Sequence, residues 1–159
     1  MTQHVYRVFI SASPEAIWDA ITKPEWSQLY GYGGLVDYEL KAGGAFVTKA
    51  DAPLLAAGAP DLIADGEVLE ADPPRKLVQT WRMLMDPGLA QEGFTRLTYE
   101  IDERRPGLCA LTVVHDLTGA PGVEQLVEGN MAQAGGGWAW VLSSLKTLLE
   151  TGKPLEWVP

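Results

Sequence analysis

The sequence predicts an α+β fold in which one curved antiparallel sheet packs against a long C-terminal helix. Three observations support this prediction. An early strand is followed by helix-start chemistry, six short segments of alternating polarity then run between tight turns, and the C-terminal part carries apolar residues at helical spacing. The connections between the six segments are too short to hold crossover helices, so we expect the strands to pair antiparallel.

The N-terminal part is expected to form a strand followed by two short helices. The strand, residues 5–10 (VYRVFI), is rich in β-branched and aromatic residues. After it, Ser13 can cap a helix, Pro14 suits the first helical position, and Glu15 favours the positive end of the helix dipole. Pro24 ends this helix and opens a one-turn successor.

The middle of the chain is expected to supply six strands. The candidate segments are GLVDYEL, GAFVTKA, DLIADGEVLEAD, KLVQTWRML, TRLTYEID and LCALTVVHDL. Turn signatures such as KAGG, DPPR, DPG and RRPG separate them. Two connections are longer, APLLAAGAP (52–60) and MDPGLAQEGF (85–94). We expect both to cover a bound ligand, because loops that mix glycine or proline with exposed apolar residues commonly gate pockets.

The last element is expected to be a single amphipathic helix from about Val123 to Thr151. Apolar residues follow steps of four and three along it, which predicts a continuous apolar stripe. Its members are Val127, Met131, Ala134, Trp138, Val141, Leu145 and Leu148. A straight helix of this length would be a rod of about 43 Å, so the sheet must curl around it. Gly152 followed by Pro154 is a helix stop.

Three consecutive glycines, Gly135 to Gly137, interrupt this pattern beside Trp138 and Trp140. Inside a helix they would cost about 3 kcal/mol relative to alanine. We expect the bare backbone to let the helix approach the sheet or bend over it, with the tryptophans filling the space alongside. Replacing Gly136 by alanine should then lower stability or ligand affinity, although alanine is the better helix former.

Composition and charge exclude several classes of protein. The chain has 159 residues with 21 acidic and 12 basic ones, a net charge of −9, and fits one domain over residues 1–159. No basic run marks a nucleic-acid or anionic-membrane partner. No apolar run approaches the roughly 18 residues of a membrane helix, and the start does not read as a signal peptide. The single cysteine, Cys109, fits a reducing compartment, so we expect a cytoplasmic protein.

Five segments in register resemble a known superfamily: ISASPEAIWDAIT, GEVLEADPPRKLVQTW, TRLTYEI, ALTVVHDL and GGWAWVLSSLKTLLE. Together they cover nearly the whole chain and look like the SRPBCC superfamily, which includes the START and birch-pollen-allergen folds. Within it, the chain is most similar to the branch named after the C-terminal domain of the activator of the heat-shock-protein-ninety ATPase.

The resemblance implies the helix-grip fold, in which a curved antiparallel sheet wraps a long C-terminal helix and leaves a deep cavity between them. It implies less about function. Members bind lipids, sterols, hormones or polyketides, some catalyse cyclisation or dehydration, and some sequester toxic natural products.

The histidines are the first candidates for chemistry. His4 and His115 are expected on different strands, and His115 shares strand parity with Leu111 and Val113, so it faces the interior if they do. There it could contact a ligand or act as a general base. The alternative is a structural histidine that is hydrogen-bonded at the strand end. Two histidines and one cysteine without short-range pairing do not make a metal site, and we expect no cofactor.

Aromatic residues give the stronger signal. Trp81 shares strand parity with Gln79 and Met83, and Tyr99 shares it with Leu97. If these faces point inward, the interior is apolar with few polar groups, as a small-molecule pocket requires; the alternative is an ordinary core. Gln79 departs from the aromatic or apolar residue usual in the resembled family, so it is a candidate specificity determinant. The candidate ligand-binding residues are Gln79, Trp81, Met83, Leu97, Tyr99, Val113, His115, Met131, Trp138 and Val141.

We therefore expect a non-catalytic protein that binds an apolar, aromatic or polyketide-like small molecule in an internal cavity, for transport, sensing or sequestration. One alternative is an enzyme of the cyclase or dehydratase type that uses His115, Tyr99 or an acidic group in the same cavity. The other is a protein–protein adaptor of co-chaperone type. We assign no catalytic residue, and a homodimer remains open.

Overall fold

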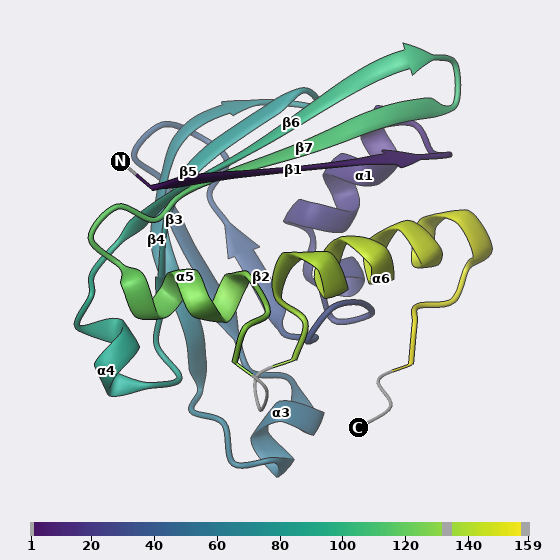
Figure 1. Ribbon diagram of the computed structural model, residues 1–159. Coiled ribbons are helices and arrows are strands. Elements are labelled where there is room, and N and C mark those ends of the chain that lie inside the picture. Colours follow the sequence, from purple (N-terminus) through teal and green to yellow (C-terminus); the bar gives the residue numbers. More distant parts are fainter. Residues whose placement is uncertain (1, 132–134, 157–159) are drawn as a thin grey trace.

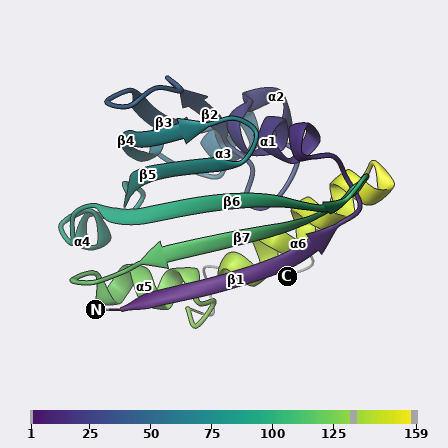
Figure 2. The same cartoon turned by 90° about the horizontal axis from the view of Figure 1, so that it is seen from above.

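A seven-stranded antiparallel sheet curves over the C-terminal helix in the computed structural model, which describes residues 2–131 and 135–156 (Figure 1). The strand order is β1-β7-β6-β5-β4-β3-β2, so the first strand pairs with the last one. Figure 2 shows α5 and α6 beneath β1 and β7. The elements are β1 Gln3–Ile10, α1 Pro14–Thr22, α2 Pro24–Ser27, β2 Leu35–Tyr38, β3 Ala45–Lys49, α3 Ala52–Ala56, β4 Leu62–Asp72, β5 Lys76–Met83, α4 Pro87–Ala90, β6 Thr95–Arg105, β7 Leu108–Asp116, α5 Pro121–Val127 and α6 Gly137–Thr151.

The predicted α+β class, the antiparallel pairing and the two short helices after the first strand are confirmed. Ser13 is the N-cap of α1, and its hydroxyl accepts a hydrogen bond from the backbone N–H of Ala16 at 3.2 Å. α1 buries Ile17 and Ile21 in the main core, where each side chain contributes about 1.5–3 kcal/mol. Pro24 starts α2 one residue after α1 ends at Thr22.

The main core lies between the concave face of the sheet and the helices α1 and α6. The inward parity expected for the central strands agrees with the structure, because Leu77 on β5 and Leu111 on β7 both belong to the main core cluster. Leu142 and Leu145 of α6 pack into the same cluster. A second, smaller cluster joins α5 to the end of β7; its members are Leu117, Ala120, Val123 and Val127.

The prediction of a single C-terminal helix is wrong. The described residues of this part of the chain form two helices, α5 and α6, and between them Gly129 and Gly135 have left-handed φ values of 80° and 86°. Met131 lies in that segment, and Ala134 lies outside the described residues. The apolar steps continue across the break because each helix buries an apolar face, α5 in the smaller cluster and α6 in the main core. α6 is therefore about 22 Å long instead of about 43 Å.

The glycine triplet lies at the N-terminus of α6 and not in the interior of a helix. Gly136 is the N-cap and Gly137 is the first helical residue, so the expected helix penalty does not arise for all three. A Cβ atom on Gly137 would lie 2.1 Å from the carbonyl oxygen of Val127, because the end of α5 passes directly over the start of α6. A Cβ atom on Gly136 would lie 2.8 Å from Cβ of Trp140. At Gly137 the bare backbone thus allows contact between α5 and α6, whereas the close neighbour of Gly136 lies within α6 itself; neither contact is the expected approach to the sheet.

The loop between α2 and β2 holds the first turns of α6. The backbone N–H of Gly137 donates to the Tyr32 hydroxyl at 2.8 Å, and the indole N–H of Trp140 donates to the Gly31 carbonyl at 3.0 Å. In the other direction, the N–H of Gly31 donates to the Ser144 hydroxyl at 3.1 Å. These hydrogen bonds join residues more than a hundred positions apart in the chain.

Both longer connections contain a short helix, α3 and α4. The connection that contains α4 is tied to α5, because the carboxylate of Glu92 accepts hydrogen bonds from the backbone N–H groups of Gly122 and Val123, each at 2.8 Å. α5 has no side-chain cap from its own N-cap residue, Ala120. Glu92 therefore supplies from a distant loop the acceptor that a helix N-terminus requires.

Replacing Glu92 by alanine is expected to lower the free energy of unfolding by about 1–2 kcal/mol, since it removes the cap and a favourable charge from the N-terminus of α5. Urea unfolding measures this change. The matched control is Glu67→Ala on an exposed part of β4, which should change stability by less than about 0.5 kcal/mol. Equal effects of the two substitutions would contradict the capping role.

Candidate ligand-binding site

Five aromatic side chains meet where the sheet faces the start of α6. Trp138 of α6 lies with its ring centroid 6.3 Å from Tyr6 of β1, 6.1 Å from Tyr99 of β6 and 6.0 Å from His115 of β7. Trp81 of β5 meets the ring of His115 edge-on at 5.9 Å. We name these residues the aromatic cluster. It brings together four predicted site residues and adds Tyr6, which the sequence analysis did not select.

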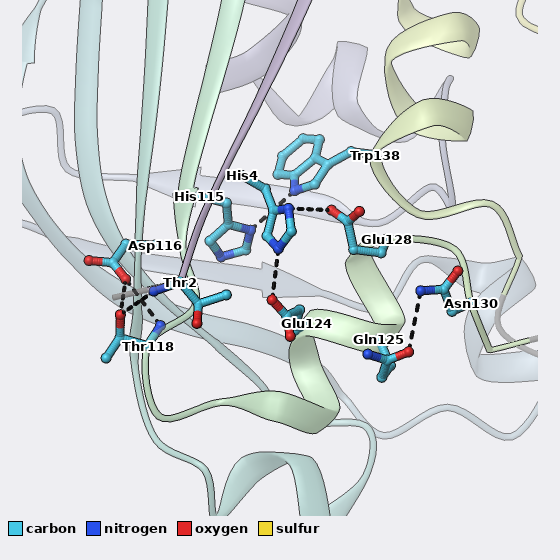
Figure 3. Close-up of polar contacts among 10 residues, drawn as sticks. All are labelled: Thr2, His4, His115, Asp116, Thr118, Glu124, Gln125, Glu128, Asn130 and Trp138. Carbon is cyan, nitrogen blue, oxygen red and sulfur yellow. Dashed lines mark hydrogen bonds and ion pairs between the residues drawn. The ribbon is translucent and has the colours of Figure 1, made fainter.

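His115 is hydrogen-bonded through both ring nitrogens. The indole N–H of Trp138 can only donate, so Nδ1 of His115 accepts at 3.1 Å (Figure 3). Nε2 then carries the proton and donates to the Thr95 hydroxyl at 2.8 Å, and that hydroxyl donates to the Trp81 carbonyl at 3.0 Å. This chain of hydrogen bonds requires a neutral imidazole of one defined tautomer.

The electrostatic surroundings of His115 agree with the neutral form. Burial lowers the pKa of His115 from 6.5 to about 4; the nearby Asp116 partly opposes this shift, and His4 adds to it. The side chain is only 1% exposed. A neutral ring with both nitrogens engaged has no free nitrogen for a ligand or a transferred proton, and this geometry favours the structural alternative over the catalytic one.

His4 lies directly opposite His115 in the pairing of β1 with β7, yet its ring serves different partners. Its Nε2 is 2.7 Å from Oε2 of Glu124, and its Nδ1 is 3.3 Å from Oε1 of Glu128 (Figure 3). Both carboxylates belong to α5 or its C-cap. His4 therefore connects the edge strand to α5 and forms no acid–base pair with His115.

Gln79 finds its hydrogen-bond partner within the protein. Its side chain is fully buried, its Oε1 accepts from the hydroxyl of Tyr38 on β2 at 2.6 Å, and its Nε2 donates to the carbonyl of Thr80 at 3.2 Å. Tyr38 in turn packs against Phe46 with ring centroids 4.6 Å apart. The buried glutamine thus has the partner that the sequence analysis required, supplied by a strand that lies far from β5 in the sequence.

The other predicted site residues divide into two groups. Leu97 and Val113 are core positions with 2% and 0% exposure. Met83, Met131 and Val141 keep partial exposure, at the end of β5, between the two last helices and on α6, respectively.

Three tyrosines have hydroxyl groups that are surrounded by protein atoms, although their side chains keep some solvent-exposed surface. Burial raises the pKa of the hydroxyls of Tyr30, Tyr38 and Tyr99 above the usual 10.0. The side chains are nevertheless half-buried instead of fully buried. Protein atoms therefore surround these rings without covering them completely.

Two hollows lie elsewhere on the molecule. One, of about 570 Å³, lies beside the start of α1 and the β4–β5 turn and has charged walls that include Glu15, Arg75 and Asp102. The other, of about 280 Å³, lies between β5 and β6 and includes Phe94 and Arg96. Neither matches the apolar cavity expected between the last helix and the sheet, so that cavity stays a prediction.

Other kinds of site find little support in the described part of the chain. Among residues 2–131 and 135–156, no group of His, Cys, Asp and Glu side chains could hold a metal ion. Within the same residues, no helix is both long enough and apolar enough to span a bilayer. The thiol of Cys109 is completely buried and donates to the carbonyl of Ala12 at 3.3 Å.

A seven-stranded antiparallel sheet that curves over a C-terminal helix and turns aromatic side chains toward it defines the helix-grip class of α+β proteins. Within this class, the chain belongs to the family described as activator of Hsp90 ATPase homolog 1-like protein, whose model matches residues 11–150. The resemblance inferred from the sequence is thereby confirmed. No curated protein sequence matches the chain significantly.

Solved structures with the same fold cover nearly all of the chain. Protein MLL2253 from Mesorhizobium loti is 21% identical with a TM-score of 0.66, over 93% of this chain and 96% of that one. The Aha1 dimer from Colwellia psychrerythraea is 18% identical with a TM-score of 0.66, over 96% and 99%. DynU16, a putative protein in the dynemicin biosynthetic locus, is 22% identical with a TM-score of 0.67, over 96% of this chain and 48% of its own. At these identities the likeness concerns the fold alone.

Proposed function

We propose that the chain binds an apolar, aromatic small molecule between α6 and the concave face of the sheet. The observation that carries the proposal is the aromatic cluster, in which the rings of Trp81, Tyr99 and Trp138 stand at the centre of the fold and are only half-buried. Half-buried rings suit another ring system, because offset and edge-to-face contacts between rings are favourable.

Binding without chemical change is the form of the proposal that the polar groups favour. His115 uses both ring nitrogens, and Gln79 already bonds Tyr38, so neither is available to move a proton. The cyclase or dehydratase alternative would need such a group next to the ligand. The roles of Gln79 and His115 in this proposal are to shape the walls of the site.

Two of the similar solved structures bear on the proposed ligand class and on the proposed oligomeric state. DynU16 is described as a putative protein in a biosynthetic locus, which is compatible with a natural product as the ligand. The neighbour from Colwellia psychrerythraea is a dimer, and we include a homodimer in the proposal. A reducing compartment agrees with the buried free thiol of Cys109.

The proposed cover of the ligand is the connection 85–94 together with α5. Leu89 of this connection packs against the small α5 cluster, which Trp81 and Trp138 also contact, and Glu92 caps α5. The connection and α5 would therefore move as one unit. The connection 52–60 supports a covering role less well, because α3 buries no residue.

A screen of aromatic natural products tests the proposal. A ligand at a hundred times its dissociation constant is expected to raise the free energy of unfolding by about 2.7 kcal/mol. Thermal unfolding measures this stabilisation, and mass spectrometry of the recovered ligand follows its fate. The variant Tyr99→Leu should lose most of the stabilisation, whereas Trp26→Phe at an exposed position should keep it. Turnover of the ligand would reject binding as the function and favour the enzyme.

A further inference from the structure

The hydroxyl of Tyr6 is a buried group without a hydrogen-bond partner among the described residues. Tyr6 lies on the concave side of β1, where it packs against the main core, and its ring lies 6.3 Å from that of Trp138 at a tilt of 38°. Buried hydroxyls in folded proteins almost always have a partner, because leaving one unpaired is costly. An unpaired hydroxyl at this place therefore requires an explanation.

The ring nitrogens of Trp138 and His115 in the aromatic cluster are already engaged with partners other than Tyr6. The indole N–H of Trp138 bonds His115, and His115 also bonds Thr95. His4, two residues before Tyr6 on the same face of β1, lies between Glu124 and Glu128. The hydroxyl of Tyr6 is thus buried and has no partner among the described residues, so it is free to donate.

We propose that the Tyr6 hydroxyl donates a hydrogen bond to an acceptor oxygen of the bound molecule and so orients it in the aromatic cluster. This inference rests on the proposed function and deepens it by naming the class of ligand: a neutral aromatic ketone or quinone. The flat ring system would lie against Trp138 and Tyr99, and the carbonyl oxygen would accept from Tyr6.

The charge of the interior selects a neutral ligand. Among the described residues, the buried polar side chains are Thr22, Ser27, Gln79, Thr95, Thr112, His115 and Ser144, with no lysine or arginine. A carboxylate placed in such surroundings would lose its hydration without gaining a cation, which is strongly unfavourable. A carbonyl group loses little hydration and needs one donor, which Tyr6 offers.

The experiment compares two probes of nearly equal shape, 2-acetylnaphthalene and 2-ethylnaphthalene, which differ in the carbonyl oxygen. Quenching of tryptophan fluorescence measures their dissociation constants for the wild-type chain and for Tyr6→Phe. We expect the wild-type chain to bind the ketone about tenfold more tightly than the hydrocarbon. Tyr6→Phe should lose this preference, bind the hydrocarbon as before and melt at an equal or higher temperature.

The matched control is Tyr32→Phe, which removes a hydroxyl that already has a protein partner, the N–H of Gly137. It should melt at a lower temperature and keep the preference for the ketone. An unchanged preference in Tyr6→Phe would overturn the inference and leave the proposed function standing, because both probes would still bind. Failure of both probes to bind the wild-type chain would overturn the proposed function and the inference with it.

Discussion

Replacing Gly137 by alanine is expected to lower the free energy of unfolding by about 3–5 kcal/mol, near the upper end of single-site effects. Two costs combine at this residue. Its φ of 63° lies in the left-handed region, which costs a residue with a Cβ atom about 1–2 kcal/mol. The new Cβ would also lie 2.1 Å from the carbonyl oxygen of Val127, so the end of α5 must move away from α6.

Urea unfolding compares this variant with Gly152→Ala. Gly152 caps α6 with a φ of 83°, but a Cβ atom there would meet nothing within 4 Å. Gly152→Ala therefore reports the conformational cost alone, about 1 kcal/mol. The difference between the two variants measures the contact between α5 and α6. Equal losses would mean that the two helices do not press against each other at Gly137.

Lowering the pH from 6.5 to about 4 is expected to reduce the free energy of unfolding by about 3 kcal/mol through His115 alone. In this range the unfolded chain binds a proton at His115 and the folded chain does not, so the proton stabilises the unfolded state. Above pH 6.5 neither state is protonated there, and the contribution vanishes. Protonation in the folded state would place a second donor opposite the indole N–H of Trp138 and break their hydrogen bond.

The test is the difference in pH dependence between the wild-type chain and His115→Gln, whose side chain does not titrate. Both chains lose stability in acid through their carboxylates, and this common part cancels in the difference. We expect the variant to be less stable at pH 7 and to lose markedly less stability between pH 6.5 and 4. Parallel curves would show that His115 titrates normally in the folded chain and that the hydrogen-bond chain does not hold it neutral.

These two residues also hold together the elements at the centre of the fold. Gly137 sets how closely α5 and α6 approach, and His115 ties Trp138 of α6 to Thr95 of β6 through a neutral ring. Both keep the aromatic cluster in place.

Sequence features such as capping residues, prolines and alternating polarity correctly predicted those helix ends and strand faces that depend on nearby residues. Ser13 and Pro14 start α1 as expected, and Gly152 ends α6. Alternating residues placed Gln79 and His115 on the concave face, because a strand presents every second side chain to the same side. Each of these outcomes depends on neighbours within a few positions along the chain.

The break between α5 and α6 shows the limit of the same reasoning. Apolar spacing through Val127 and Leu145 is compatible with one helix or with two helices that each bury an apolar face. The glycines make the single helix less stable, but they do not exclude it. The contact of Gly137 with the Val127 carbonyl decides between them. That contact exists only after α5 and α6 have folded onto the sheet.

The sequence by itself determined the fold class and the antiparallel sheet, because periodicity, capping and turn chemistry are local properties of the chain. The family followed from the resemblance of five segments, and the inward faces of the strands were conditional on which residues the structure buries. The tertiary structure alone decided the partners. It placed β1 beside β7, so that His4 and His115 lie opposite each other but contact different partners. It also left the Tyr6 hydroxyl buried without a hydrogen-bond partner among the described residues. Hydrogen-bond partners depend on which strands and helices come into contact. Some of these partners are more than a hundred positions apart in the chain, and no local sequence pattern can predict a contact over that separation.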